Sequence, residues 1–404
     1  MTNNRLKNVG GLNEVFVCGI ILVGSMNFFN IDFLMNTLKF LFFWTLTLTL
    51  CVIIYSRHCP SVPEFSLNKQ KNSLDSSRIL LETRFIPQPD FILFAHSPTL
   101  TRLSNGDLLA LWFAGNDEGK PDVKIWQSTC HNGAWKMAHT VVSPELISKE
   151  TKRYVRKVGN PVVYKSAKGT LHLFVVTAIG GWAASSLNEL DSYDEGKTWQ
   201  NTRRLILTPF FDLSTLCRTS PVALNDGGFY LPVYHESVRD YPEILRFDSE
   251  GNFVQQIRMT SHNDILQPSI VPLDKQKAYA FFRNNGDEPR TLYRQQTNNC
   301  GLEWGELEKT NLNNPNSSLV VEEILPGKFL MVHNPDDRCK ITLSTSNDGL
   351  KWQEFYTLED VTGESFSYPS IYVHDDVVDI LYSWKKQKIK HVRFNLAWLK
   401  SKGF

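Results

Sequence analysis

The pattern of apolar and polar residues separates a membrane-type segment near the N-terminus from a long region of short apolar stretches. Phe40–Tyr55 reads FLFFWTLTLTLCVIIY, and extension back to Phe33 adds only Lys39 as a charged residue. Such a stretch is long enough to cross a hydrocarbon core of about 30 Å. Because no small-residue cleavage site follows it, the pattern favours an uncleaved signal anchor over a removed signal peptide.

The chain changes character again after this segment. Residues 57–77 are rich in Ser, Asn, Lys and Pro and lack apolar periodicity, as a flexible tether does. We therefore predict a tail and transmembrane anchor over residues 1–56, a linker over residues 57–78 and a folded domain over residues 79–400. The first 34 residues are either a short cytoplasmic tail or lie upstream of a start at Met35. The expected product is a single-pass membrane protein with its folded domain on the periplasmic or extracellular side.

A short segment with a proline near its head recurs six times after the linker. Small or β-branched residues follow the proline, and several copies continue through a turn into an apolar stretch. Proline has no N–H to donate to a β-ladder, so we predict that each proline begins the inner strand of one repeat. The six residues, 47 to 63 positions apart, are Pro98, Pro161, Pro221, Pro268, Pro315 and Pro369.

A second signal, a glycine-containing turn that ends in tryptophan, keeps step with the prolines. Residues 192–199 fit the pattern S-x-D-x-G-x-T-W, and residues 297–304 and 345–352 are degenerate copies. In such a turn the Asp or Asn side chain accepts backbone N–H bonds and the glycine takes a positive φ. We expect three tryptophans, 36 to 38 residues after their prolines, to be largely buried at outer hairpin turns: Trp199, Trp304 and Trp352.

Repeats of about 50 residues that combine strands with a Gly/Trp turn are typical of β-propeller blades. Six copies predict an all-β, six-bladed β-propeller preceded by one transmembrane helix. Residues 79–86 precede the first proline and are expected to supply the outer strand of the last blade, which would close the ring. A β-solenoid or a sandwich is the alternative, but a sandwich does not repeat its turn chemistry six times.

The composition restricts the function further. Lys and Arg number 43 against 42 Asp and Glu, and the net charge of +1 argues against a nucleic-acid-binding protein. Aromatic residues make up 12% of the chain, which suits a β-rich fold. The seven cysteines show no CxxC or Cys/His ligand spacing, so we expect no metal site and no cofactor.

The eight-residue turn is the Asp-box, and with six repeats it makes the chain resemble the sialidase (neuraminidase) superfamily over roughly residues 79–400. The likeness is greatest to bacterial predicted sialidases with BNR repeats and an N-terminal membrane anchor. Asp-boxes identify a fold better than an activity, because non-enzymatic propellers carry them too. The more specific shared segments are His96–Leu100, Gly159–Pro161, Gly180–Trp182, Leu231–Glu236, Leu266–Ser269, Asn314–Ser318 and Ser367–Ser370.

The resemblance implies an exo-sialidase-like glycoside hydrolase that removes a terminal sialic acid or a related acidic sugar. Sialidases bind the sugar carboxylate with arginines, attack with a tyrosine and protonate the leaving group with a carboxylic acid. Tyr368 matches the nucleophile, and Arg283 and Arg338 match two of the carboxylate-binding arginines. The general acid is expected from one loop of the first repeat, where Glu118 is the best match and Asp117 and Asp122 are alternatives.

Two positions depart from the family pattern. His96 stands where the family has its first arginine, and Gln267 stands where it has the carboxylate that activates the tyrosine. A neutral Gln cannot act as a base. Arg218 or Lys157 is therefore a candidate to complete the cationic site, and Glu236 is a candidate to assist Tyr368.

The same residues also have structural interpretations. Arg283 is equally consistent with a salt bridge between blades, and Asn160, beside a strand-head proline, is a candidate either for substrate binding or for hydrogen bonds between blades. Three hypotheses remain open: a membrane-anchored exo-glycosidase for sialylated glycans, a non-catalytic glycan-binding propeller, and a glycosidase for a different acidic sugar. The expected partners are an acidic glycan and, through the N-terminal helix, a membrane, but no nucleic acid.

Overall fold

The computed structural model describes residues 33–52, 62–67, 78–207, 214–237 and 239–404. Contacts within the chain divide it into an N-terminal unit that ends at Val62 and a second unit that begins at Pro63. The two units are described separately.

The N-terminal unit contains one helix, Phe33–Val52, that is long and apolar enough to cross a membrane. An N-terminal signal sequence has the same length and hydropathy, so this helix is consistent both with a membrane anchor and with a signal sequence. Its threonine hydroxyls each donate to a backbone carbonyl three or four residues earlier, which lowers the cost of these polar groups in hydrocarbon. The predicted apolar segment Phe40–Tyr55 overlaps this helix, and its last three residues lie outside the described residues.

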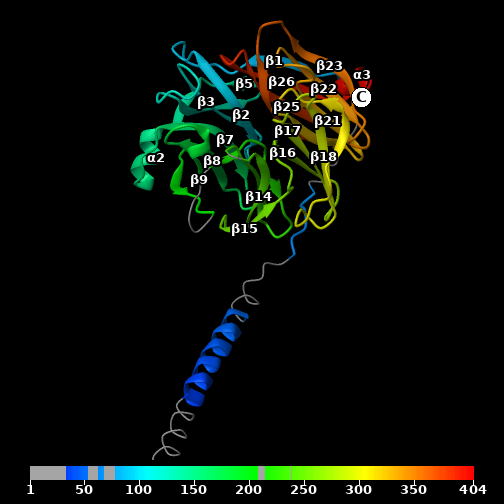
Figure 1. Cartoon of the computed structure of the whole chain (residues 1–404). Coiled ribbons are helices and arrows are strands. Elements are labelled where there is room, and N and C mark those ends of the chain that lie inside the picture. Colours follow the sequence, from blue (N-terminus) through cyan, green and yellow to red (C-terminus); the bar gives the residue numbers. More distant parts are fainter. Residues whose placement is uncertain (1–32, 53–61, 68–77, 208–213, 238) are drawn as a thin grey trace, which may run out of the picture. The chain divides into compact units, whose positions relative to one another are not determined.

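The described residues of the second unit form six antiparallel sheets arranged as the blades of a propeller (Figure 1), which confirms the predicted fold. The first strand of each blade lies against the first strand of its neighbours, so these inner strands surround one axis. Blade 1 holds β2 (Phe94–Arg102), β3 (Leu108–Gly115), β4 (Lys124–His131), β5 (Ala134–Trp135) and β6 (His139–Val142); blade 2 holds β7 (Lys157–Lys165), β8 (Leu171–Ala178), β9 (Ser185–Ser192) and β10 (Gln200–Arg204); blade 3 holds β11 (Thr215–Cys217), β12 (Val222–Ala223), β13 (Phe229–His235), β14 (Tyr241–Phe247) and β15 (Phe253–Arg258).

The second half of the propeller repeats this arrangement. Among the described residues of this unit, one short α-helix lies between blades 1 and 2, one follows the last blade, and a 3₁₀ turn lies between β8 and β9 of blade 2. Blade 4 holds β16 (Ile265–Pro272), β17 (Ala278–Asn284), β18 (Thr291–Thr297) and β19 (Glu308–Asn313); blade 5 holds β20 (Val320–Leu325), β21 (Lys328–His333), β22 (Lys340–Ser346) and β23 (Gln353–Asp360); blade 6 holds β24 (Phe366–His374), β25 (Val377–Trp384), β26 (Lys388–Asn395) and β1 (Leu81–Phe85). The helices are α2 (Pro144–Thr151), a 3₁₀ turn at Trp182–Ala184 and α3 (Leu396–Ser401).

The ring closes as the sequence predicts, because β1 supplies the outer strand of the last blade. β1 pairs antiparallel with β26, and the register runs from Leu81 opposite Phe394 to Phe85 opposite Lys390. The last blade is thus built from both ends of the propeller sequence, a closure that ties the first repeat to the last.

The prolines do not begin the inner strands, contrary to our expectation. Four of them lie inside these strands, at places where the register to the second strand shifts; Pro221 precedes β12, and Pro315 lies five residues before β20. The missing N–H leaves the ladder unpaired at that point, and a β-bulge absorbs the interruption. The residues before these four prolines have φ between 38° and 57°: Ser97, Asn160, Gln267 and Tyr368.

The Asp-box turns form as predicted, between the third and fourth strands of their blades. In the turn after β9, the Asp194 carboxylate accepts bonds from the N–H and the hydroxyl of Thr198, and Gly196 has φ of 80°. In the turn after β22, the pattern aligned Thr345 and Asn347 with the Ser and Asp positions. The hydrogen bonds of this turn are made instead by the next residues, Ser346 and Asp348.

The expected burial of the turn tryptophans holds for only one of the three. Trp352 is buried, whereas Trp199 and Trp304 are half-buried. The indole N–H of Trp199 donates to Gln127 of the neighbouring blade at 2.9 Å. This ring therefore seals a seam between blades from its outer side instead of entering the core.

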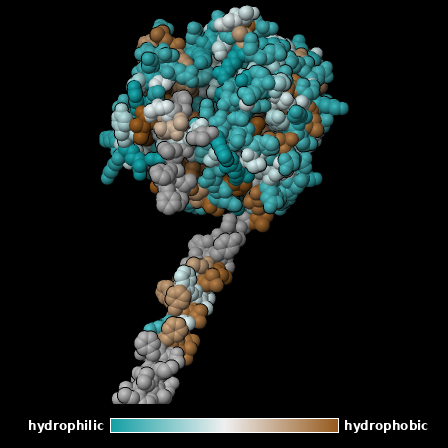
Figure 2. Space-filling view, in the orientation of Figure 1, coloured by the Kyte–Doolittle hydropathy of each residue, from teal (hydrophilic) through white to brown (hydrophobic). Residues whose placement is uncertain are grey.

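Buried apolar side chains fill the seams between neighbouring blades. One seam joins Trp112 of blade 1 to Leu381 and Ile389 of blade 6, and another joins Phe281 of blade 4 to Phe329 of blade 5. The face seen in Figure 2 is mostly hydrophilic, so the apolar residues of the propeller are largely inside it. This packing holds the inner strands in fixed positions around the axis.

The linker does not behave uniformly as a tether. Phe65 is fully buried against Tyr230, with ring centroids 6.1 Å apart, and its backbone N–H donates to the carbonyl of Lys275 at 2.8 Å. A β-bridge to Leu224 fixes it further. One aromatic residue in an otherwise polar segment therefore docks the linker between blades 3 and 4, and residues 53–61 and 68–77 lie outside the described residues.

Replacing Trp352 by Ala should lower the free energy of unfolding by about 3–5 kcal/mol, because the ring is buried and packs edge-on against Phe281 at 5.5 Å. Denaturant unfolding of the full chain in detergent measures the change. Trp199→Ala is the matched control and should cost clearly less, since that ring is half-buried. Equal losses in the two variants would show that burial does not govern the turn tryptophans.

Candidate functional site

The bulges of the inner strands place several predicted site residues at one end of the propeller axis. Tyr368 lies in the bulge of β24, Gln267 in that of β16 and Asn160 in that of β7, while His96 precedes the bulge of β2. Arg218 follows directly after β11. Because positive φ redirects a side chain relative to a regular strand, these bulges determine what faces the end of the channel.

Tyr368 is surrounded by cations and by one histidine. Arg283 Nη1 donates to Tyr368 Oη at 3.3 Å. The guanidinium carbon of Arg218 lies 5.2 Å from the centre of the Tyr368 ring, and that of Arg338 lies 6.0 Å from it. The His96 ring centroid is 4.4 Å from that of Tyr368. Side chains from five different blades therefore meet at one phenol.

Asn316 connects two of the arginines, although no individual role was predicted for it. Its side-chain oxygen accepts a bond from Arg283 Nε at 2.7 Å, and its backbone carbonyl accepts one from Arg338 Nη2 at 2.8 Å. Asn316 itself has φ of 53° and is held by the side chain of Asn285. The blade-to-blade salt bridge considered for Arg283 is absent from the described residues, where its bonds go to Asn316 and Tyr368.

Arg218 is a buried cation that ties three blades together. It is 2% exposed, and its Nη2 and Nη1 donate to the carbonyls of Pro369 at 2.7 Å and Pro98 at 3.3 Å. Burial lowers its pKa to about 10. No carboxylate among the described residues forms an ion pair with it. A buried guanidinium group that lacks a carboxylate partner is stabilised by an anion that reaches the site.

His96 is a neutral residue in this environment. Burial lowers its pKa well below the usual value, and the charges of Lys386, Arg338 and Arg218 lower it further. It is 2% exposed, and its Nδ1 has no hydrogen-bond partner among the described residues. The imidazole at the position of the family's first arginine therefore offers a hydrogen bond but no charge at neutral pH.

Gln267 and Asn160 both bond to a second tyrosine that the sequence analysis missed. Gln267 Nε2 lies 3.1 Å and Asn160 Nδ2 lies 3.3 Å from Tyr234 Oη. Burial raises the pKa of Tyr234, and the nearby Tyr368 and Glu236 raise it further. The signal for Tyr234 was present in the shared segment Leu231–Glu236, but a single buried aromatic in a strand is usually a packing residue.

The carboxyl groups differ in their distance from this cluster. Glu236 is half-buried; burial raises its pKa, while Arg283 opposes the rise. Glu118 is exposed, its Oε2 pairs with Lys386 Nζ at 3.1 Å, and its charge raises the pKa of Arg338, which burial lowers overall. Glu118 thus reaches the edge of the arginine cluster from the loop after β3.

Asp117 and Asp122 shape the loop that carries Glu118. Asp117 Oδ1 accepts the backbone N–H of Glu118, and Asp122 Oδ2 accepts that of Asn116, each at 2.8 Å. Both are exposed turn residues. These bonds hold the loop that presents Glu118.

The cluster His172, Glu189 and Asp191 in blade 2 has ligand types that suit a metal ion. Burial lowers the pKa of His172, but the bonds from Asp191 and Glu189 outweigh this and raise it to about 9. Arg203 Nη2 also pairs with Glu189 at 2.9 Å. Two cations therefore balance the two carboxylates, and the described side chains of the cluster form a buried ion network.

Solved structures share this architecture at low sequence identity. A Hadza microbial sialidase, Hz136, is 17% identical over 76% of this chain and 66% of its own length, with a TM-score of 0.65. The Trypanosoma rangeli sialidase is 14% identical over 80% of this chain and 61% of its own, with a TM-score of 0.63. A Dyadobacter fermentans protein of unknown function is 14% identical over 79% of this chain and 98% of its own, with a TM-score of 0.63. These likenesses concern the fold, and the chain spans about two thirds of the length of the two sialidases.

Six blades with Asp-box turns and an arginine-lined axis define a sialidase-like propeller. Residues 106–380 match the family of BNR repeat-like domains, and the chain belongs to this family. Among curated protein sequences, none matches the chain.

The lowered pKa of His96 gives the stability of the fold a pH dependence. Between the lowered pKa and the usual value of about 6.5, the unfolded chain binds more protons than the folded one, so stability falls as the pH drops. His96→Gln should reduce the loss of unfolding free energy between pH 7.5 and pH 5.5. Chemical unfolding at both values measures it. His139→Gln, at an exposed position, should leave the loss unchanged. An unchanged loss in His96→Gln would contradict the assignment of a buried neutral imidazole.

Proposed function

We propose that the chain is a glycoside hydrolase of sialidase type that releases a terminal sialic acid or a related acidic sugar. The observation that carries this proposal is the convergence of Arg218, Arg283 and Arg338 around Tyr368, with no carboxylate of the described residues paired to Arg218. Guanidinium groups match a carboxylate in charge and shape, and partial burial increases their attraction for it. An acidic sugar is the glycan component that provides this charge.

In the proposed reaction Arg283 and Arg338 bind the sugar carboxylate. Asn316 accepts a hydrogen bond from each arginine and so fixes the positions of both guanidinium groups. Tyr368 Oη attacks the anomeric carbon while the bond to the leaving oxygen breaks, and Glu118 supplies the proton to that oxygen. Water then cleaves the glycosyl–tyrosine bond with Glu118 as base. This sequence follows retaining glycosidases with a tyrosine nucleophile.

The phenol proton needs an acceptor, and Gln267 cannot take it. We assign this role to Glu236, because burial raises its pKa and a higher pKa makes a carboxylate a stronger base. Arg218 over the Tyr368 ring and Arg283 at its oxygen stabilise the negative charge that develops there.

A different acidic sugar is the second candidate substrate. The observation in its favour is the neutral His96 beside Tyr368. The family pattern has an arginine at this position, so the carboxylate site of this chain carries one positive charge fewer. A non-catalytic glycan-binding propeller is the remaining alternative. Assay of the full chain on a fluorogenic sialoside and on a panel of fluorogenic uronides distinguishes the three.

Tyr368→Phe should abolish hydrolysis of the best substrate while glycan affinity stays within about twofold, because the variant loses only the nucleophilic oxygen. Initial rates and equilibrium binding of the same glycan measure the two effects. Arg338→Ala is the companion variant and should instead weaken binding tenfold or more, the loss of a charge-assisted bond worth about 1.5–3 kcal/mol. Full activity in Tyr368→Phe would exclude the mechanism. Glycan binding without hydrolysis in the unmodified chain would establish the binding-protein alternative.

We further propose that helix Phe33–Val52 anchors the chain and that the propeller lies on the periplasmic or extracellular side, where sialylated glycans are found. One charge-poor helix of 20 residues supports a single span. A reporter that is active only outside the cytoplasm, fused after Phe404, should be active. The same reporter fused before Met1 is the control and should be inactive. The reverse result would place the propeller in the cytoplasm.

A further inference from the structure

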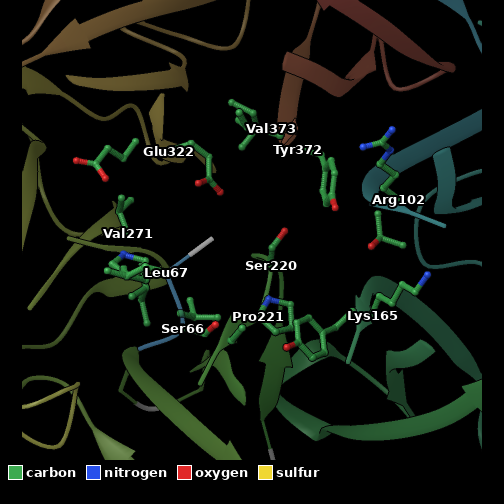
Figure 3. A pocket seen from close by; sticks show the side chains of 18 of the residues that line it. Ser66, Leu67, Arg102, Lys165, Ser220, Pro221, Val271, Glu322, Tyr372 and Val373 are labelled. Carbon is green, nitrogen blue, oxygen red and sulfur yellow. The ribbon is translucent and has the colours of Figure 1, made fainter. Parts of the chain in front are cut away.

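A second feature of the propeller axis lies at the opposite ends of the inner strands from Tyr368. A cavity of about 830 Å³ lies there, within the volume range of small-molecule sites. The last residues of the inner strands line it, and Figure 3 shows Tyr372, Ser220 and Glu322 around it from three different blades. Tyr372 lies four residues after Tyr368 on β24, so about 13 Å separate the two positions along the strand.

Each charged side chain that lines this cavity has an ion pair or a hydrogen bond among the described residues, with one exception. Arg102 Nη1 pairs with Asp375 at 3.5 Å, and Lys165 Nζ pairs with Glu195 at 3.2 Å. Glu323 Oε1 accepts the backbone N–H of Gly327 at 2.7 Å. The Glu322 carboxyl group has neither an ion pair nor a hydrogen bond within the described residues.

The environment of Glu322 is unfavourable for an unpaired carboxylate. Burial raises its pKa to about 7, and the neighbouring Glu323 adds to the rise. A cation that enters the cavity would relieve this cost, because it supplies the opposite charge inside a partly desolvated space.

The rest of the lining selects among cations. Val271, Val373 and Pro221 are apolar, and Figure 3 shows them facing the same space as Tyr372. An aromatic face and apolar walls attract organic ammonium ions, whereas a divalent metal ion needs about six oxygen ligands. The hydroxyl groups of Tyr372, Tyr164 and Ser220 form no hydrogen bond among the described residues, so they are free for a polar substituent on the ligand.

We propose that this cavity is a second binding site, which takes a compact organic ammonium ion with a hydroxyl group. Glu322 pairs with the ammonium group, Tyr372 covers it, and the free hydroxyls bond to the ligand's hydroxyl. The site is separate from the arginine cluster, so the proposal does not rest on glycoside hydrolysis. An anion fits less well here because Arg102 and Lys165 are engaged.

Choline and 3,3-dimethylbutan-1-ol test the proposal, because they share shape and hydroxyl group and differ in the positive charge. Titration of each into the full chain in detergent at pH 8, where most Glu322 groups are ionised, should show at least tenfold tighter binding of choline. Glu322→Gln should remove this preference. Glu323→Gln, the matched control, and Tyr368→Phe, at the other end of the axis, should both retain it.

Three outcomes would overturn the proposal. The first is equal binding, or no binding, of choline and the neutral alcohol to the unmodified chain. The second is an equal loss of preference in Glu323→Gln and Glu322→Gln, which indicates a diffuse negative field instead of a site. The third is loss of choline binding in Tyr368→Phe, which assigns the binding to the arginine-lined end. A thermal unfolding midpoint within about 2 °C of the unmodified chain verifies that each variant is folded.

Discussion

The missing amide hydrogen of proline in the inner strands is the constraint on which the site depends. An inner strand with a complete ladder would turn alternate side chains toward its two faces and none toward the end of the channel. At Ser97, Asn160, Gln267 and Tyr368 the ladder is interrupted and the backbone takes positive φ. The positive φ of each such residue costs on the order of 1–3 kcal/mol. The strand pairing on both sides of the bulge compensates for this cost. The bulge thus directs selected side chains to a common point.

The fold was predictable because its strongest signals are local. The bonds of an Asp-box, such as those between Asp194 and Thr198, join residues within one turn, so their spacing is visible in the sequence and repeats with the blade. The closure of the ring by β1 was predictable from the number of repeats and from the strand that precedes the first of them. The burial of Trp199 was not predictable, because its partner Gln127 belongs to the preceding blade and the depth of the ring depends on how two blades meet. The docking of Phe65 into the seam near Tyr230 has the same non-local origin.

The site was predictable only in part, for the same reason. Resemblance to a family drew attention to Tyr368, Arg283 and Arg338, which the propeller brings together. The roles of Arg218 and Asn316 depend on contacts that the sequence does not encode locally. Arg218 bonds to a carbonyl 151 residues away, and Asn316 to an arginine 33 residues away. Asp117 and Asp122 show a different case, in which acidic residues near the cluster also make local hydrogen bonds within their own loop.

The two ends of the axis carry opposite unpaired charges, and the strand direction explains why they stay apart. Among the residues that the structure describes, Arg218 at the bulged ends is buried without a carboxylate partner, and Glu322 at the far ends has no cation beside it. If the two groups were adjacent they would neutralise each other and neither end would attract a ligand. The inner strands run between the two ends, with about 13 Å between Tyr368 and Tyr372 on β24, and so keep the two groups from pairing directly. Each end can therefore keep a charge that a ligand compensates.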